Sequence, residues 1–422
     1  MFFKLLKDAL KVKNVRNKIL FTIFIIFVFR VGTHVTVPGI NAESLKQLSD
    51  LPFLNMLNLV SGNAMNNFSI FSMGVSPYIT ASIIVQLLQM DIYPKFVEWG
   101  KQGEVGRRKL NQATRYITLV LAFVQSIGIT ASFNTLSSIS LVKTPNVSTY
   151  LLIGTILTAG SIIVTWLGEQ ITDKGFGNGV SMIIFSGIIA SIPKMFSTIY
   201  EDFFVNVRSG ELTRSYIIVA LLIVVGLAIV FFTTFVQQAE YQIPIQYTKL
   251  VQGAPTSSYL PLKVNPAGVI PVIFASSITT IPSTFLPFFS KVTWLSHLQG
   301  LLSYNTPSGM ITYAILIILF SFFYTFVQVN PEKTAENLQK NGSYIPSVRP
   351  GRETEKYMSS LLKRLATIGA VFLAFISLAP IAAQQFMHLT SSIALGGTSL
   401  LILISTGIEG MKQLEGYLLK RQ

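Results

Sequence analysis

Residues 55–89 decide the fold, and they read NMLNLVSGNAMNNFSIFSMGVSPYITASIIVQLLQ. A short apolar piece at 56–60 runs into a polar, flexible stretch at 61–67, and a second apolar segment starts at Gly74 and continues through Ile92. The first piece is too short to cross a hydrocarbon core, which needs about 20 helical residues, whereas the second is long enough. Pro77 falls in the first turn of the second piece, where its missing N–H costs least. The sequence therefore predicts a re-entrant half-helix at about 55–67, followed by a span.

A half-helix of this kind is tolerated in a membrane only where other protein or a water-filled cavity surrounds it. Two interpretations follow from the stretch alone. The segment lies in or beside a cavity inside a helical bundle, or it fills space between packed helices.

The composition predicts an all-α polytopic membrane protein. Half of the residues are hydrophobic, 12% are charged, and long apolar runs alternate with short basic loops. The chain has no cysteine, which excludes disulfides and thiolate metal sites. Residues 1–18 alternate apolar side chains with lysines at helical spacing, which predicts an amphipathic helix on the cytoplasmic membrane surface. The net charge of +14 is explained by basic loops on one side of the membrane, so no specific DNA partner is expected.

Ten spans fit the hydropathy, and their positions also predict the orientation. With the N-terminus inside, the inner segments hold 25 Lys and Arg and the outer segments hold 5, so both termini are expected in the cytoplasm. The spans are predicted near 19–37, 73–92, 116–136, 150–167, 179–198, 215–236, 267–287, 309–329, 365–382 and 393–409.

Ten spans divide into two halves of five, at 19–198 and 215–409. Because five is odd, the second half enters the membrane in the opposite sense, and such inverted halves commonly place a functional path at their interface. An outer hinge loop is expected at 199–214 and a cytoplasmic tail at 410–422. The inside loops 237–266 and 330–364 are unusually long, which favours docking sites for a cytosolic partner.

The sequence contains no constellation typical of catalysis or ion coupling. No acidic residue lies in the middle of a predicted span, and the three histidines fall at outer ends or outer loops. A coupled carrier normally needs ionisable groups at mid-membrane, so a small-molecule transporter on inverted repeats is the weaker alternative. There is no phosphate-binding loop, zinc pair or catalytic dyad, so we expect no enzyme, no metal and no cofactor.

Branched aliphatic residues follow glycine or proline near the middle of several spans, at 181–184, 272–273 and 401–402. A ring of such residues forms a hydrophobic constriction in some channels. The same residues equally suit a lipid-facing or core position, and periodicity alone does not distinguish these cases.

Several motifs resemble those of bacterial SecY, the pore-forming subunit of the general protein-secretion (Sec) channel. The likeness runs in order over essentially the whole chain. The motifs are GVSPYITASII (74–84), GNGVS (177–181), LPLKVNPAGVIP (260–271), NPEKTA (330–335), RPG (349–351) and GGTSLL (396–401).

The resemblance implies roles for individual residues. The pore ring is expected at Val75, Ile79, Ile184, Ile273 and Ile402. The plug that seals the resting channel is expected at 55–67, including Met56, Leu57, Leu59, Val60, Ser61, Gly62 and Asn63. Asn178 matches a polar residue linked to plug closure. Gln86 is a candidate for the lateral gate, formed by spans 2 and 3 against 7 and 8, or else an ordinary buried amide.

The resemblance also implies partners. Arg349 and Arg352 lie in a loop where ribosomes and the SecA ATPase dock, and the planar guanidinium of arginine suits bidentate recognition. An arginine pair common after Gly253 is replaced here by Ala254-Pro255, which leaves Lys249 as the nearest basic residue. SecE and SecG are implied as membrane subunits, and signal-sequence-bearing preproteins as cargo, in the bacterial plasma membrane. An insertase with a lateral groove but no through-pore is a third hypothesis.

Overall fold

The computed structural model describes residues 8–41, 61–62, 64–90, 92–136, 141–205, 212–247, 257–285, 301, 306–387 and 397–419. Each of the ten predicted spans coincides with a helix. These helices are α2 (Lys13–Gly32), α5 (Ser76–Leu88), α7 (Gly103–Leu136), α8 (Val147–Lys174), α9 (Gly179–Tyr200), α10 (Leu212–Gln238), α11 (Ile270–Phe285), α13 (Pro307–Gln328), α15 (Arg352–Met387) and α16 (Gly397–Leu419).

Helix starts follow from short polar side chains and proline. Asn178 caps α9, and the Thr306 hydroxyl accepts a hydrogen bond from the Gly309 N–H at 3.1 Å at the start of α13. Asn330 caps α14 (Pro331–Lys340) by accepting from the Lys333 N–H at 3.0 Å. Pro77 lies in the first turn of α5, as predicted from the sequence.

Within the described residues, six helices are long and apolar enough to cross a membrane, namely α7, α8, α9, α10, α13 and α15. The helix α5 and the start of α11 are shorter apolar helices. α7 and α15 extend well beyond their predicted spans, because basic and acidic residues continue both helices outside the apolar stretch.

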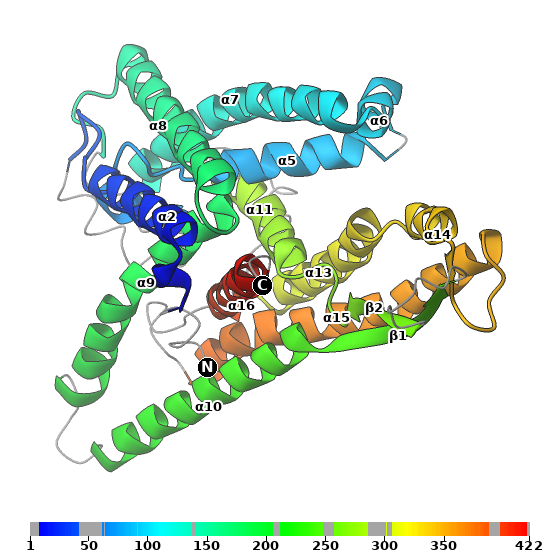
Figure 1. The fold of residues 1–422 in the computed structure, drawn as a ribbon. Helices are drawn as coiled ribbons and strands as arrows, with labels where there is room; N and C mark the ends of the chain where they lie inside the picture. Colours follow the sequence, from blue (N-terminus) through cyan, green and yellow to red (C-terminus); the bar gives the residue numbers. More distant parts are fainter. Residues whose placement is uncertain are drawn as a thin grey trace.

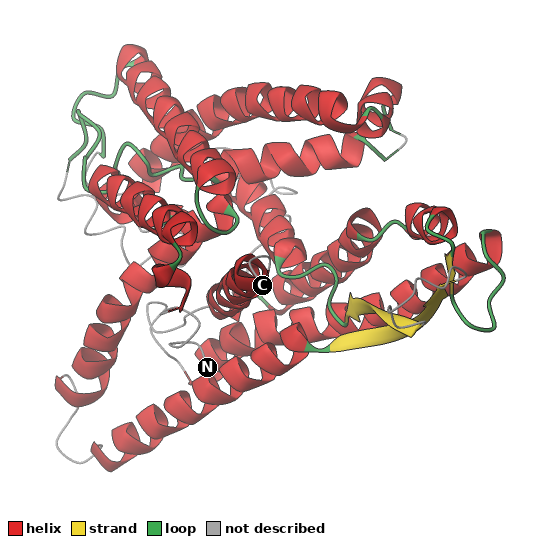
Figure 2. Cartoon of the chain, viewed as in Figure 1, coloured by secondary structure: helices red, strands yellow, loops and turns green. Residues whose placement is uncertain are grey.

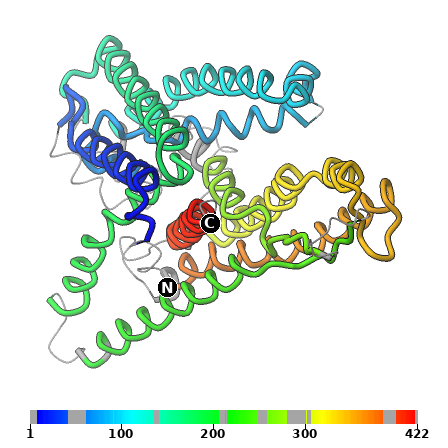
Figure 3. The backbone as a smooth tube through the Cα atoms, in the orientation of Figure 1, coloured from blue at the N-terminus to red at the C-terminus, as the bar shows by residue number. Residues whose placement is uncertain are grey.

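The helices form two groups that meet along α11 and α16 (Figure 1). We call α2, α5, α7, α8 and α9 the first half, and α10, α11, α13, α15 and α16 the second half. α11 contacts α5 and α7, and α16 contacts α9. The backbone trace shows α9 and α10 diverging, with the π-helical turn η2 (Glu201–Val205) at the end of α9 (Figure 3).

The described parts of the two long segments that we predicted to lie inside contain regular secondary structure, where we expected loops. Residues 237–266 contain β1 (Glu240–Tyr247) and β2 (Ser257–Lys263), which pair antiparallel, with Ile243 opposite Leu260. The two-residue strand β3 (Ser343–Tyr344) completes a sheet of order β2-β1-β3 (Figure 2). Residues 330–364 contain α14, β3 and the first turns of α15. Alternation along β1 buries Ile243 and Ile245, a strand signal too short to stand out in the sequence.

One apolar cluster unites the halves. It contains Phe29 of α2, Ile183 of α9, Val272 of α11, Tyr313 of α13 and Leu401 of α16. A separate cluster, with Ile243, Met358 and Leu362, attaches the sheet to the start of α15. The sheet and α14 therefore lie at one end of the second half, away from the shared core (Figure 1).

Candidate functional site: an aliphatic cluster between the two halves

The five residues predicted to form a ring come together in the cluster that the halves share. Four of them are buried, and Ile273 is half-buried and packs against the same cluster. Two helices of each half contribute. The members are Val75 and Ile79 at the start of α5, Ile184 in α9, Ile273 in α11 and Ile402 in α16.

Each ring residue lies at or within the first two turns of its helix, and glycines precede these starts. Gly74, Gly177 and Gly268 have positive φ values of 52°, 83° and 62°, a backbone region that L-residues with side chains seldom adopt. Each glycine turns the chain just before the helix begins. The signal readable in the sequence is thus a glycine followed by a helix whose first turns are aliphatic.

Only part of the predicted plug lies within the described residues. Met56, Leu57, Leu59, Val60 and Asn63 lie outside them. Ser61 is 1% exposed, and the 3₁₀ turn η1 (Ala64–Asn67) buries Ala64 and Met65. The described residues of the stretch 61–67, which the sequence indicated as polar and flexible, are therefore buried or half-buried.

Side chains of neighbouring helices hold the segment that leads to Val75 by hydrogen bonds to its backbone carbonyls. Arg30 of α2 donates a hydrogen bond to the Gly62 carbonyl, and Ser161 of α8 donates one to the Gly74 carbonyl at 3.0 Å. A Cβ on Gly187 of α9 would overlap the Gly62 Cα. Irregular backbone inside a membrane protein needs such partners, because lipid offers none.

Asn178 has a structural role in this geometry. Its side chain accepts a hydrogen bond from the Ser181 N–H at 3.3 Å and so caps α9. The residues that contact Gly62 are instead Phe29, Arg30 and Gly187. Sequence reasoning placed Arg30 inside a span without giving it a role; a lone cation in an apolar helix was the available signal.

Gln86 lies on α5, which contacts α7 and α11 at the junction of the halves. Its Nε2 donates to the Ser82 hydroxyl at 3.1 Å, one turn earlier. Its Oε1 is buried and has no hydrogen-bond partner among the described residues. A buried, unpaired acceptor is costly, because it has lost its hydrogen bond to water without gaining another.

Arg349 and Arg352 are exposed at the end formed by the sheet and α14. Gly351, with φ of 94°, makes the turn between them, and the Thr354 hydroxyl donates to the Arg349 carbonyl at 3.0 Å. The backbone is fixed while both guanidinium groups reach solvent. Lys249 lies outside the described residues. Within those residues no group of three or more His, Asp or Glu side chains is placed to hold a metal.

Comparison with known proteins bears directly on this arrangement. The SecY family model matches residues 69–411. The chain belongs to the SecY family. It is 72% identical over 426 residues to the protein translocase subunit SecY of Streptococcus gordonii, covering 100% of this chain and 98% of that one. The SecY subunits of Streptococcus sanguinis and Bacillus subtilis are 71% and 49% identical, with 100% and 99% of this chain covered and 98% of each relative.

The SecY fold is also seen in solved structures. A structure described as that of a protein conducting channel matches with a TM-score of 0.70 at 15% identity, covering 96% of this chain and 93% of that one. Sec61 in a canine ribosome-channel complex matches with a TM-score of 0.65 at 14% identity, over the same shares of the two chains. At these identities the likeness shows the fold alone. With the family, it establishes a multi-pass membrane protein.

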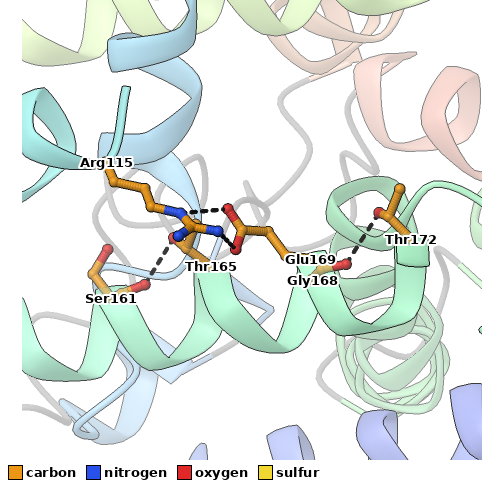
Figure 4. A network of polar contacts seen from close by, with 6 residues as sticks. All are labelled: Arg115, Ser161, Thr165, Gly168, Glu169 and Thr172. Carbon is orange, nitrogen blue, oxygen red and sulfur yellow. Dashed lines mark hydrogen bonds and ion pairs between the residues drawn. The ribbon is translucent and has the colours of Figure 1, made fainter. Parts of the chain in front are cut away.

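An ion pair that sequence analysis missed joins two helices of this SecY chain. Arg115 of α7 makes a bidentate contact with Glu169 of α8, with Nε–Oε1 at 3.1 Å and Nη2–Oε2 at 2.5 Å (Figure 4). On the same helix the Thr172 hydroxyl donates to the Gly168 carbonyl and accepts from the Gly179 N–H, which fixes the start of α9. We predicted Glu169 in a loop after span 4; the structure extends α8 past it to Lys174.

Proposed function

We propose that this chain is the central subunit of the channel that moves unfolded secretory proteins across the bacterial plasma membrane and releases membrane proteins sideways into lipid. One observation carries the proposal. Aliphatic residues from α5 and α9 of one half and from α11 and α16 of the other belong to a single cluster at the junction. The names of the close relatives support the same function.

An apolar constriction suits this task physically. At rest it excludes water and ions, because wetting a narrow aliphatic passage is unfavourable. During transport it fits around varied side chains without binding any of them strongly. Val75, Ile79, Ile184, Ile273 and Ile402 are the proposed constriction, and the segment leading from Ser61 into Val75 positions the plug beside it.

The proposed lateral gate lies between α5 and α7 on one side and α11 and α13 on the other. A signal sequence would enter there, the halves would separate by hinging at the outer link between α9 and α10, and the plug would leave the path. Sufficiently apolar chains would exit through the same opening into lipid. The buried, unpaired Oε1 of Gln86 supports a polar role at this junction.

The channel is passive, so partners supply the energy. The exposed Arg349 and Arg352, presented on a fixed turn, are proposed to dock the SecA ATPase and the ribosome. SecE and SecG are proposed as the membrane subunits of the complex. The excess of Lys and Arg in the inner segments supports a topology with both termini in the cytoplasm.

The test is preprotein import and single-channel conductance in vesicles that contain this chain with SecE and SecG. We expect import by the wild type with SecA and ATP. Ile402→Asn and Ile273→Asn should raise resting ion leak and relax signal-sequence selection, because the amide hydrates the constriction. The volume-conserving Ile402→Leu is the control and should remain sealed.

Two results would count against the proposal. If both Asn variants stayed as tight and as selective as the wild type, the ring assignment would be wrong. If the wild type neither imported nor conducted but accumulated a small solute, the transporter hypothesis would replace the channel.

A further inference from the structure

A polar junction joins the halves at the end of α9 opposite η2. We call it the clasp, and it consists of Lys18 and Thr22 of α2, the turn 175–178 between α8 and α9, and Gln413 and Tyr417 of α16. The Phe176 N–H donates to the Thr22 hydroxyl at 2.8 Å, and the Gly177 N–H donates to the Gln413 Oε1 at 2.7 Å.

The clasp also ties the first helix of the chain to the last. The Lys18 Nζ donates to the Tyr417 hydroxyl at 3.0 Å and lies 4.6 Å from the centroid of that ring, within the range of a cation–π contact. Ala9 and Val15 form a small apolar cluster with Leu414 beneath these contacts. Segments separated by about 400 residues are therefore joined at one place.

Further contacts fix α16 within the second half. Lys412 pairs with Glu240, the first residue of β1, with Nζ–Oε1 at 2.5 Å, and Glu240 follows closely on α10. On the opposite side of α16, a Cβ on Gly410 would lie 3.3 Å from the Phe176 ring. The end of α16 is thus held between the turn 175–178 and the end of α10.

The junction of α11 with α5 has a different chemistry. Apart from Gln86, whose amide donates a hydrogen bond within α5, the residues that it contributes to the shared cluster are apolar and include Ile79 and Ile83 of α5 and Val272 and Ala275 of α11. Such a surface can part in a membrane at little cost, because lipid tails are as apolar as the side chains they replace. Opening the clasp would instead break two hydrogen bonds and a cation–π contact.

The clasp and the link between the halves lie at opposite ends of α9. At the link, Phe204 of η2 packs against Tyr216 of α10, with 5.2 Å between ring centroids. α9 has 22 residues, so about 33 Å of helix separates the two places. Two fixed points define an axis, and a rotation about an axis along α9 moves α11 away from α5 and α7.

We propose that the clasp is the second pivot of the channel and stays closed while the halves separate at the α5–α11 junction. This inference rests on the proposed function. It assigns Lys18, Gln413 and Tyr417 as positioning residues that act on the gate through α16, without contacting a translocating chain.

The absence of cysteine allows a clean crosslinking test. The variant Lys18→Cys/Tyr417→Cys would be crosslinked with a short bis-maleimide in vesicles that also contain SecE and SecG. Ile83→Cys/Ala275→Cys, placed across α5 and α11, is the matched pair. We expect the crosslinked clasp to import preprotein as fast as the wild type, and the crosslinked α5–α11 pair to lose import.

Loss of import on crosslinking the clasp, with import intact before crosslinking, would overturn the proposal. That result differs from a failure of the proposed function, in which the wild type itself would not import with SecA and ATP. The α5–α11 pair shows that the assay detects a locked gate.

A second pair of variants separates positioning from folding. Gln413→Leu removes the acceptor for the Gly177 N–H, whereas Gln413→Glu keeps an acceptor oxygen at that place. We expect Gln413→Leu to lower the melting temperature while resting conductance stays at the wild-type level, because a contact kept in both the closed and the open form does not shift the equilibrium between them. Gln413→Glu should restore the melting temperature. A resting conductance raised about five-fold in the Leu variant, the effect of one hydrogen bond lost from the closed form alone, would contradict the proposal.

Discussion

The Arg30 Nη1 donates a 2.6 Å hydrogen bond to the carbonyl oxygen of Gly62. Arg30 lies in the last turn of α2, and Gly62 has φ of 67°, which a residue with a side chain seldom adopts. A charged donor within a membrane-spanning helix is costly unless it is satisfied. The pair therefore fixes the segment that leads from Ser61 to the ring.

Replacing Arg30 with methionine removes this donor while keeping a long, apolar side chain. A hydrogen bond from a charged group contributes about 1.5–3 kcal/mol. We therefore expect the equilibrium between the closed and the open channel to shift toward the open form by about ten-fold or more. Resting ion conductance in vesicles measures the shift. Arg30→Lys keeps a cationic donor and should lie between the wild type and the Met variant. Wild-type conductance in Arg30→Met would show that the contact does not hold the closed state.

Gly187→Ala tests the close backbone approach between α9 and Gly62. The new methyl group would overlap the Gly62 Cα, so either the segment or α9 must move. We expect overpacking to cost about 1–3 kcal/mol of folding free energy, which lowers the melting temperature, and to raise the resting conductance. Gly226→Ala in α10 is the matched control, because nothing lies within 4 Å of its added Cβ. Similar behaviour of the two variants would argue against the contact.

Arg349→Glu should separate docking from conduction. The side chain is exposed and its backbone is fixed by Thr354, so reversal of its charge leaves the fold intact. We expect loss of SecA-driven import, with conductance retained in a channel whose plug is deleted. Lys356→Glu makes the same charge change in the first turns of α15, at another exposed position, and should import normally. Equal import by both variants would remove Arg349 from the docking surface.

Ile243→Ala should loosen the sheet without affecting the pore. Ile243 is fully buried against Met358 and Leu362, and truncation of such a residue costs about 2–5 kcal/mol. We expect faster proteolysis of the β1–β2 hairpin and weaker SecA binding at unchanged resting conductance. The exposed neighbour Gln242→Ala is the control. A change in conductance would indicate that the sheet and the shared core are coupled.

The sequence predicted helix existence better than helix length. A helix lies near the expected position of each of the ten predicted spans, because each position is an apolar run with punctuating residues. α7 begins at Gly103 rather than near 116, and α15 begins at Arg352 rather than near 365. Hydropathy measures the membrane-embedded part of a helix, and these helices continue into the charged segments beyond it.

Contacts between segments that lie far apart in the sequence were harder to predict than the helices themselves. The ring could be named only by resemblance, since an isoleucine in a span gives no sign of which neighbour it meets. The β1–β2 hairpin, the Arg115–Glu169 pair and the Lys18–Tyr417 bond each depend on partners that the linear pattern does not bring together. Gly62 is one example. Gly187 of another helix approaches it so closely that a side chain would not fit, and nothing in the sequence pairs these two glycines.

Burial differs sharply between two membrane-spanning helices, α10 and α8, and this should govern how they evolve. In α10 only 6% of the most apolar 18-residue stretch is buried within the chain, against 56% in α8. Most exchanges among Leu, Ile, Val and Phe in α10 change side chains that the described chain leaves uncovered; Ile229 and Val236, which pack against the shared cluster, and Phe232, which packs against Phe372, are exceptions. In α8, Gly160 faces the Ile70 carbonyl so closely that even alanine does not fit. Substitutions should therefore accumulate more freely along α10 than along α8, so that the sequences of the two helices diverge between relatives at different rates.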